Sequence, residues 1–93
     1  MEQMMDREGF RQMLKEREVP DDQLDQHVAL AERFAAFAGK PPTADDVLAF
    51  SAVMIEEGLN DWDNYITLAR YARFIQNDEA YVAVVEQIGR AHV

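Results

Sequence analysis

The feature that most constrains this chain is a helical spacing of apolar residues that runs almost from end to end. Apolar side chains recur three or four positions apart, and nowhere do apolar and polar residues alternate long enough to predict a strand. Prolines, glycines and asparagines divide the pattern into segments. The sequence therefore predicts an all-α fold with helices over residues 6–18, 20–38, 43–57, 60–76 and 77–89, between a lead-in (1–5) and a tail (90–93).

The expected helix boundaries follow from capping and helix-breaking residues. Thr43 can accept a hydrogen bond from the first turn of the third helix, and Asp46 occupies the reciprocal position of a capping box. Val19-Pro20 separates the first two helices, because proline cannot continue a helical ladder. We expect Asn60 to cap the fourth helix and Gly89 to end the fifth.

The length and composition favour one small globular domain. A chain of 93 residues has room for a single core, and 48% of its residues are apolar, which argues against intrinsic disorder. No apolar run approaches the ~20 residues of a membrane span, and no charged-then-apolar leader opens the chain. The absence of cysteine excludes disulfides and zinc–thiolate sites, so we expect a cytoplasmic protein without a membrane partner.

The charge is strongly negative and is distributed along the chain. Eighteen acidic residues against nine basic ones give a formal charge of −9. Nucleic acids and anionic lipids are bound largely through neutralisation of phosphate by Lys and Arg, so this field disfavours both. The charge is compatible with a solvated acidic surface or with a docking face for a basic partner.

The sequence also resembles itself at a shift of 40 residues. Six of the 25 residue pairs that begin with Phe10/Phe50 and end with Phe34/Phe74 are identical, where ordinary residue usage gives about one or two. The break at Val19-Pro20 coincides with the break at Leu59-Asn60. We interpret this as two copies of a helical hairpin that pack face to face in a bundle of four to five helices, with the last helix covering the remaining opening.

The order of helix lengths and caps carries a resemblance to a known family. It extends over about residues 10–76 and comprises residues 10–14, Val19-Pro20, residues 34–37, the Thr43-capped start at 42–47, Gly58-Leu59-Asn60 and the run 68–74. This pattern resembles the N-terminal core-binding domain of tyrosine recombinases and phage integrases, a SAM-like helical fold. The resemblance implies a domain that clamps DNA with basic side chains on its helices.

The sequence departs from that family in its charges. The second and fourth helices open with acidic residues, which would face phosphate in the family's docking geometry: Asp21, Asp22, Asp25, Asp61 and Asp63. Four basic residues remain as candidate contacts for DNA or another anion: Arg33, Lys40, Arg70 and Arg73. The recombinases carry their Arg, His and Tyr catalytic set in a second domain, which this sequence lacks, so the resemblance supports the fold more than an activity.

No constellation of catalytic, cofactor-binding or metal-binding residues emerges. The four glycines are isolated, and Ser51 is the only serine. His27 lies on an apolar helix face without a second ligand at helical spacing, which favours a packed histidine over a ligand or base. Asp61 and Asp63 are interpreted as acids of a helix N-terminus, because the glycine and glutamate positions of a calcium loop are not matched. We therefore expect a protein without enzymatic activity or cofactor.

Trp62 is the strongest candidate for a partner contact. An indole at a helix start can pack against its own turn or project toward another molecule, and the sequence leaves both open. We expect a contact surface of Leu59, Asp61, Trp62 and Asp63 that binds a protein or the rest of a longer chain, in a monomer or weak dimer. The alternatives are a DNA-contacting module and an accessory domain of an enzyme whose catalytic part lies beyond Val93.

Two expectations concern residues near that surface. Arg70 and Arg73 could bind an anion, although pairing with Glu56 or Glu57 is the favoured interpretation. The aromatic side chains of the fourth helix are expected to lie in the core rather than to form a base-stacking platform: Tyr65, Tyr71 and Phe74.

Overall fold

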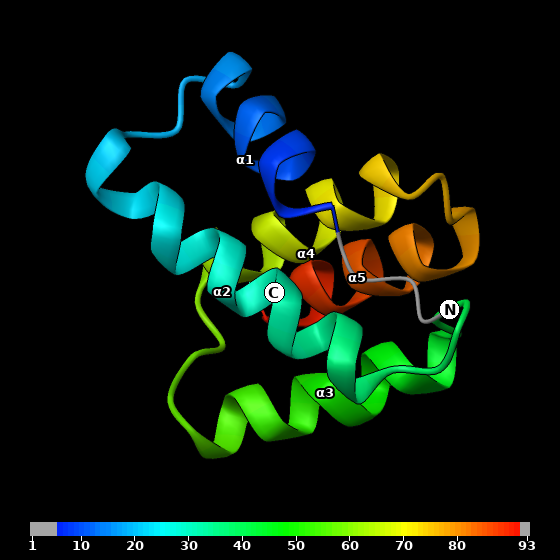
Figure 1. The fold of residues 1–93 in the computed structure, drawn as a ribbon. Coiled ribbons are helices and arrows are strands. Elements are labelled where there is room, and N and C mark those ends of the chain that lie inside the picture. Colours follow the sequence, from blue (N-terminus) through cyan, green and yellow to red (C-terminus); the bar gives the residue numbers. More distant parts are fainter. Residues whose placement is uncertain (1–5, 92–93) are drawn as a thin grey trace.

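A computed structural model describes residues 6–91, and these residues form five α-helices without a strand (Figure 1). The prediction of an all-α helical bundle is confirmed. The expected lead-in (1–5) and the last two residues of the expected tail lie outside the described residues. The helices are α1 (Arg7–Glu16), α2 (Asp21–Phe37), α3 (Ala44–Glu56), α4 (Trp62–Phe74) and α5 (Asp78–Ala91).

The start of α3 has the predicted capping box. The Asp46 backbone N–H donates to Thr43 Oγ1 at 3.2 Å, and the Asp46 carboxylate accepts from the Thr43 N–H at 2.9 Å. The same carboxylate accepts the Gly39 N–H at 3.0 Å, so Asp46 ties the end of α2 to the start of α3. These backbone hydrogen bonds, that from Thr43 first, lower the pKa of Asp46.

Two predicted boundaries were wrong. The N-cap of α4 is Asp61 and not Asn60, and Asn64 Nδ2 in the first turn of α4 donates to the Leu59 carbonyl at 2.9 Å. Helix α5 continues through Gly89 to Ala91, so the expected tail is helical at residues 90 and 91. A glycine ends a helix only where the backbone turns left-handed, and Gly89 keeps a negative φ.

The ends of α1 and α3 have the same backbone geometry. In α1 the Val19 N–H donates to the Leu14 carbonyl at 3.1 Å, and 40 residues later the Leu59 N–H donates to Met54 at 2.7 Å. The residues before them, Glu18 and Gly58, have φ of +64° and +73°. Both ends are therefore Schellman motifs, in which an apolar residue folds back onto the last turn of its helix.

The two helical pairs nevertheless differ in how their helices pack. Helices α1 and α2 pack directly against each other, whereas no Cα atom of α3 lies within 8 Å of a Cα atom of α4. Helix α5 packs against both α3 and α4 and separates them. Helices α1 and α3 consequently lie at opposite edges of the bundle, with α2, α4 and α5 between them (Figure 1). The expected second hairpin is thus a three-helix unit in which α5 is central.

Crossed aromatic pairs join the two copies in the core. Phe10 of α1 contacts Phe74 of α4 with ring centroids 5.5 Å apart and planes at 60°. Phe50 of α3 contacts Phe34 of α2 at 5.3 Å and 62°. Each pair combines one residue from each copy, which is the arrangement expected when duplicated hairpins pack face to face. Tyr71 completes the cluster with edge-on contacts to Phe10 and Phe34, so its predicted core position is confirmed.

Candidate interaction surfaces

Trp62 is the first residue of α4, and 50% of its surface is exposed to solvent. The neighbouring Asp61 and Asp63 are exposed as well, at the N-cap and in the first turn of the helix. Carboxylates are favourable there because the helix N-terminus carries a partial positive charge. The interpretation of Asp61 and Asp63 as acids of a helix N-terminus is confirmed. The Trp62 indole therefore lies between two negatively charged residues in the sequence.

Leu59 has a different environment from the other three residues of the expected contact surface. It is half-buried and packs against the core, because the Schellman motif turns it back toward Met54. Its carbonyl accepts the hydrogen bond from Asn64. Leu59 therefore holds the loop that positions Trp62, while Trp62 and the two carboxylates offer the surface.

The first candidate anion-binding residue, Arg33, is held in an ion pair. Its Nη1 and Nη2 donate to Glu57 Oε1 and Oε2 at 3.0 and 2.8 Å, in a bidentate geometry. These hydrogen bonds raise the pKa of Arg33 and lower the pKa of Glu57. Glu57 was expected to pair with Arg70 or Arg73, and that expectation was wrong, because α2 and not α4 lies beside the end of α3.

The other three candidates for an anion site have separate surroundings. The guanidinium of Arg73 lies over the ring of Tyr81 on α5, 4.3 Å from its centroid. Arg70 is half-buried and acts electrostatically on His27 of α2. Lys40 lies in the α2–α3 loop and lines an open groove at that end of the bundle. The fold thus distributes these cations over different elements.

His27 is a packed histidine, as predicted, with 7% of its surface exposed. Its Nδ1 has no hydrogen-bond partner among the described residues. Burial lowers the pKa of His27; the carboxylates of Asp63 and Asp61 raise it, and Arg70 lowers it. The position 40 residues later is Thr67, also buried, whose hydroxyl donates to the Asp63 carbonyl at 2.9 Å. The two copies therefore differ in whether this inward polar group is satisfied.

The groove beside Lys40 separates the ends of α2 and α4. Its wall includes Ala35, Phe74 and Ile75, and carboxylates lie around it at Asp6, Glu32, Asp78 and Glu79. Most of these carboxylates have structural partners: Asp6 accepts from Gly9, Glu79 from Ala44, and Glu32 pairs with Arg7 at 3.2 Å. The groove's polar groups therefore mainly join helix ends.

Sequence reasoning missed one exposed apolar face. Leu48, Ala52 and Ile55 of α3 are exposed, whereas Val47, Phe50 and Met54 of the same helix are buried. The signal was present in the 40-residue repeat, where the equivalent positions of α1 are Glu8, Gln12 and Lys15. Comparison of the two copies position by position would have marked these residues as solvent-facing.

The described residues hold no candidate metal site. Within residues 6–91, no group of three or more His, Asp or Glu side chains is placed to hold a metal ion. Ser51 is buried and its hydroxyl lies 2.7 Å from the hydroxyl of Tyr65, a contact that links α3 to α4. Over the same described residues, the longest helix is too short and too polar to cross a bilayer.

No family model matches the chain, and neither the curated proteins nor the solved structures contain a significant match.

Proposed function

We propose that this chain is a non-enzymatic helical interaction module that binds a protein partner, which is a separate molecule or another part of a longer chain. The observation that carries the proposal is the exposure of Trp62, at 50%, between two exposed carboxylates. Tryptophan is the residue type most enriched at the energetic centres of protein interfaces. Its large apolar ring gains free energy when a partner covers it.

The negative field supports a partner with basic side chains at this surface. Asp61 and Asp63 flank Trp62, and the whole chain carries a charge of −9. Complementary charge accelerates encounter and orients the partner, while the buried ring supplies affinity. A Trp62 surface of this kind fits an apolar segment with Lys or Arg on either side.

The experiment identifies the partner by its contact with position 62. A photoreactive benzoylphenylalanine at position 62, introduced in cells of the source organism, would crosslink the bound partner. The purified partner is then titrated against the unmodified chain, Trp62→Ala and the matched control Val82→Ala, which shortens an exposed apolar side chain on α5. We expect at least a ten-fold loss of affinity for Trp62→Ala, about 1.4 kcal/mol, and unchanged affinity for Val82→Ala.

Equal affinity of the Trp62→Ala variant for the crosslinked partner would overturn the proposal. Urea denaturation of each variant establishes that a loss of binding does not come from a loss of folding. A fall in affinity with rising salt is expected in addition, because the flanking carboxylates act through screened charge.

The DNA-contacting alternative has less support. It needs Arg33, Lys40, Arg70 and Arg73 on one phosphate-facing surface, whereas Arg33 is paired with Glu57 and Arg73 is stacked on Tyr81. A gel-shift assay with duplex DNA at 20–50 mM salt tests it, because phosphate binding is strongest at low salt. Retention of the duplex that disappears in Arg33→Ala and Arg73→Ala would favour this alternative over a protein partner.

A further inference from the structure

The outer face of α3 is an apolar stripe that the bundle leaves uncovered. Leu48, Ala52 and Ile55 are spaced i, i+4 and i+7, which aligns them along one side of a helix. Leu48 is 46% exposed and Ile55 is 58% exposed, and Ala52 between them is exposed as well. Nine consecutive residues, 47–55, carry no charge. A helix at the edge of a bundle ordinarily presents polar residues to water, and the outer face of α3 departs from that pattern.

The duplicated helix shows that the fold does not require an apolar surface here. In α1 the equivalent outward positions are Glu8, Gln12 and Lys15, all exposed. The inward residues agree between the copies, since Phe10 and Phe50 are both buried, as are Leu14 and Met54. The two helices therefore share one packing scheme and differ in their outer faces, which means that the stripe on α3 serves something other than the domain's own core.

We infer that the outer face of α3, defined by Leu48, Ala52 and Ile55, is a docking site for an amphipathic helix that carries basic residues at both ends of its apolar face. The inference rests on the proposed function only in requiring a protein partner, because the surface is separate from that of Trp62. Three outward residues over two turns match the spacing with which a second helix packs along a first.

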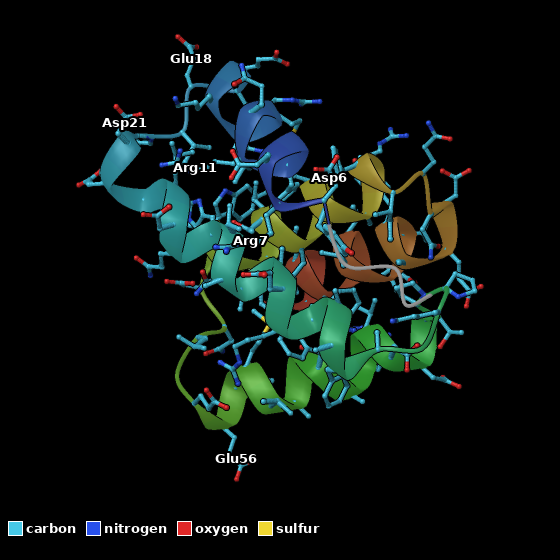
Figure 2. All side chains as sticks on the ribbon, in the orientation of Figure 1. Asp6, Arg7, Arg11, Glu18, Asp21 and Glu56 are labelled. Carbon is cyan, nitrogen blue, oxygen red and sulfur yellow. The ribbon has the colours of Figure 1, made fainter. Side chains whose placement is uncertain are left out.

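The charges at the two ends of α3 define the chemistry of the occupant. Asp45 lies in the first turn of α3 and Glu56 in the last, and both are exposed. Glu56 projects outward beyond the end of the helix (Figure 2). At the C-terminal end of α3, the neighbouring Glu57 pairs with Arg33 of α2. An apolar partner helix with Lys or Arg at both ends meets a carboxylate at each end of the stripe.

The same charges disfavour a second copy of this chain as the occupant. If two α3 helices packed antiparallel, Asp45 of one copy would lie beside Glu56 of the other at both ends. If they packed parallel, each carboxylate would meet its own counterpart. Either arrangement places like charges together at the ends of an apolar contact and brings two molecules of charge −9 into apposition.

The test uses synthetic 18-residue peptides as probes and the full chain as receptor. The first peptide has leucines at i, i+3, i+4 and i+7 repeats and two lysines at each end; the second replaces those lysines by glutamates. The decisive variant gives α3 the outer residues of α1: Leu48→Glu, Ala52→Gln and Ile55→Lys. The matched control, Val82→Glu with Val85→Lys, makes the same kind of change at exposed apolar positions of α5.

We expect the lysine peptide to bind the unmodified chain and the α5 control equally, by calorimetry and by ¹⁵N chemical-shift changes along α3. Binding to the α1-like variant is expected to be at least ten-fold weaker, as is binding of the glutamate peptide to the unmodified chain. Trp62→Ala is expected to bind the lysine peptide with unchanged affinity. Loss of peptide binding in Trp62→Ala alone would transfer the site to the Trp62 surface and refute the α3 inference while leaving the proposed function intact.

Three results would overturn the inference. The lysine peptide could bind the α1-like variant as tightly as the unmodified chain, or the glutamate peptide could bind as tightly as the lysine peptide. Alternatively, sedimentation could show a dimer of the unmodified chain that the α1-like variant loses, which would make a second copy the occupant. If the triple variant fails to fold, Ala52→Glu introduces a charge at the centre of the stripe with a single exposed substitution and tests the same surface.

Discussion

Helices α1 and α3 occupy equivalent positions in the two copies of the repeat but have opposite outer faces. Both bury a phenylalanine and end in a Schellman motif, with Val19 or Leu59 folded back onto the last turn. On the outside, α1 is polar and tied to α2 by ion pairs, Arg7 with Glu32 at 3.2 Å and Arg11 with Asp25 at 3.4 Å. Helix α3 is uncharged from residue 47 to residue 55.

The difference shows which properties packing fixes and which it leaves variable. The contact between Arg11 and Asp25 in the first copy corresponds to that between Ser51 and Tyr65 in the second. In the second copy the long tyrosine side chain spans the wider space that α5 creates between α3 and α4. The buried anchors of α1 and α3 have kept their apolar character, whereas buried positions of α2 and α4 have changed, as at Leu24 and Asn64.

The largest change in the free energy of unfolding should come from the buried phenylalanines of α1 and α3. Phe10→Ala and Phe50→Ala each remove a ring that is at most 2% exposed, and each should destabilise the fold by about 3–5 kcal/mol. Urea denaturation at pH 7 measures both. Costs that agree within about 1 kcal/mol would support equivalent core positions. A cost below about 1 kcal/mol for either ring would show that the two sites are not equivalent.

Substitutions at the C-terminal ends of α1 and α3 should change the stability in opposite directions. Glu18 and Gly58 share a left-handed conformation, which strains a residue with a Cβ and suits glycine. Glu18→Gly should therefore stabilise the fold by about 1 kcal/mol, and Gly58→Ala should destabilise it by about the same amount. A Cβ at Gly58 would meet no atom within 4 Å, so its cost is conformational alone. Thermal unfolding of both variants checks the sign, and changes of the same sign would contradict the shared geometry.

Replacement of glycines inside helices by alanine should give a smaller change in stability. Gly89 lies within α5, and a Cβ there would meet no atom within 4 Å, so Gly89→Ala should raise stability by about 0.5–1 kcal/mol. Gly9 of α1 is the control, because its Cβ would collide with the Asp6 carboxylate that caps the helix. Gly9→Ala should therefore give no stabilisation. Circular-dichroism melts of the two variants measure the difference, and equal gains would show that the Asp6 cap contributes little.

The smallest effect at neutral pH concerns His27 and its counterpart Thr67. Because burial lowers the pKa of His27, the unfolded chain binds a proton at higher pH than the folded chain. The stability associated with neutral His27 is complete above its ordinary value of 6.5 and falls as the pH drops below it toward the folded pKa. His27→Gln should remove this part of the pH dependence.

The measurement for His27 is the urea midpoint between pH 5 and pH 8. The carboxylates and the guanidinium that face the imidazole, Asp61, Asp63 and Arg70, are retained in both proteins, so the difference between the two pH profiles isolates the histidine. Thr67→Val is the matched control, because Thr67 does not titrate and its hydroxyl is already satisfied. Superimposable profiles for the unmodified chain and His27→Gln would refute the expected dependence.

Much of the fold could be predicted from local signals. Thr43 and Asp46 predicted the start of α3 because their side chains bond to backbone groups three residues away. Two boundaries differed from the prediction, because the residue types at Asn60 and Gly89 permit a cap without requiring one: α4 is capped by Asp61, and α5 continues through Gly89. The ion pair between Arg33 and Glu57 joins residues 24 positions apart, so no helical spacing could reveal it.

The two candidate surfaces differ in how much the sequence indicated about them. For Trp62 the sequence left open whether the indole packs against its own turn or projects outward, and the structure leaves it 50% exposed beside the exposed Asp61 and Asp63. The stripe of α3 was missed, because an apolar spacing reports which residues could be buried and does not report which side a neighbour covers. Only the position of α5, which packs beside α3 and leaves Leu48 and Ile55 outside, decided that question.

The sequence by itself determined that this chain is helical, where most of its helices begin and end, and that two copies of a helical pair share one apolar scheme. Those properties depend on hydrogen bonds and side-chain spacing within a few residues of each position. The tertiary structure alone decided that α5 enters the second pair, that Arg33 is paired with Glu57, and that α3 presents an apolar face to solvent. These outcomes depend on which helix faces meet across the bundle. A helix with apolar residues on more than one side can pack against its neighbours in more than one way.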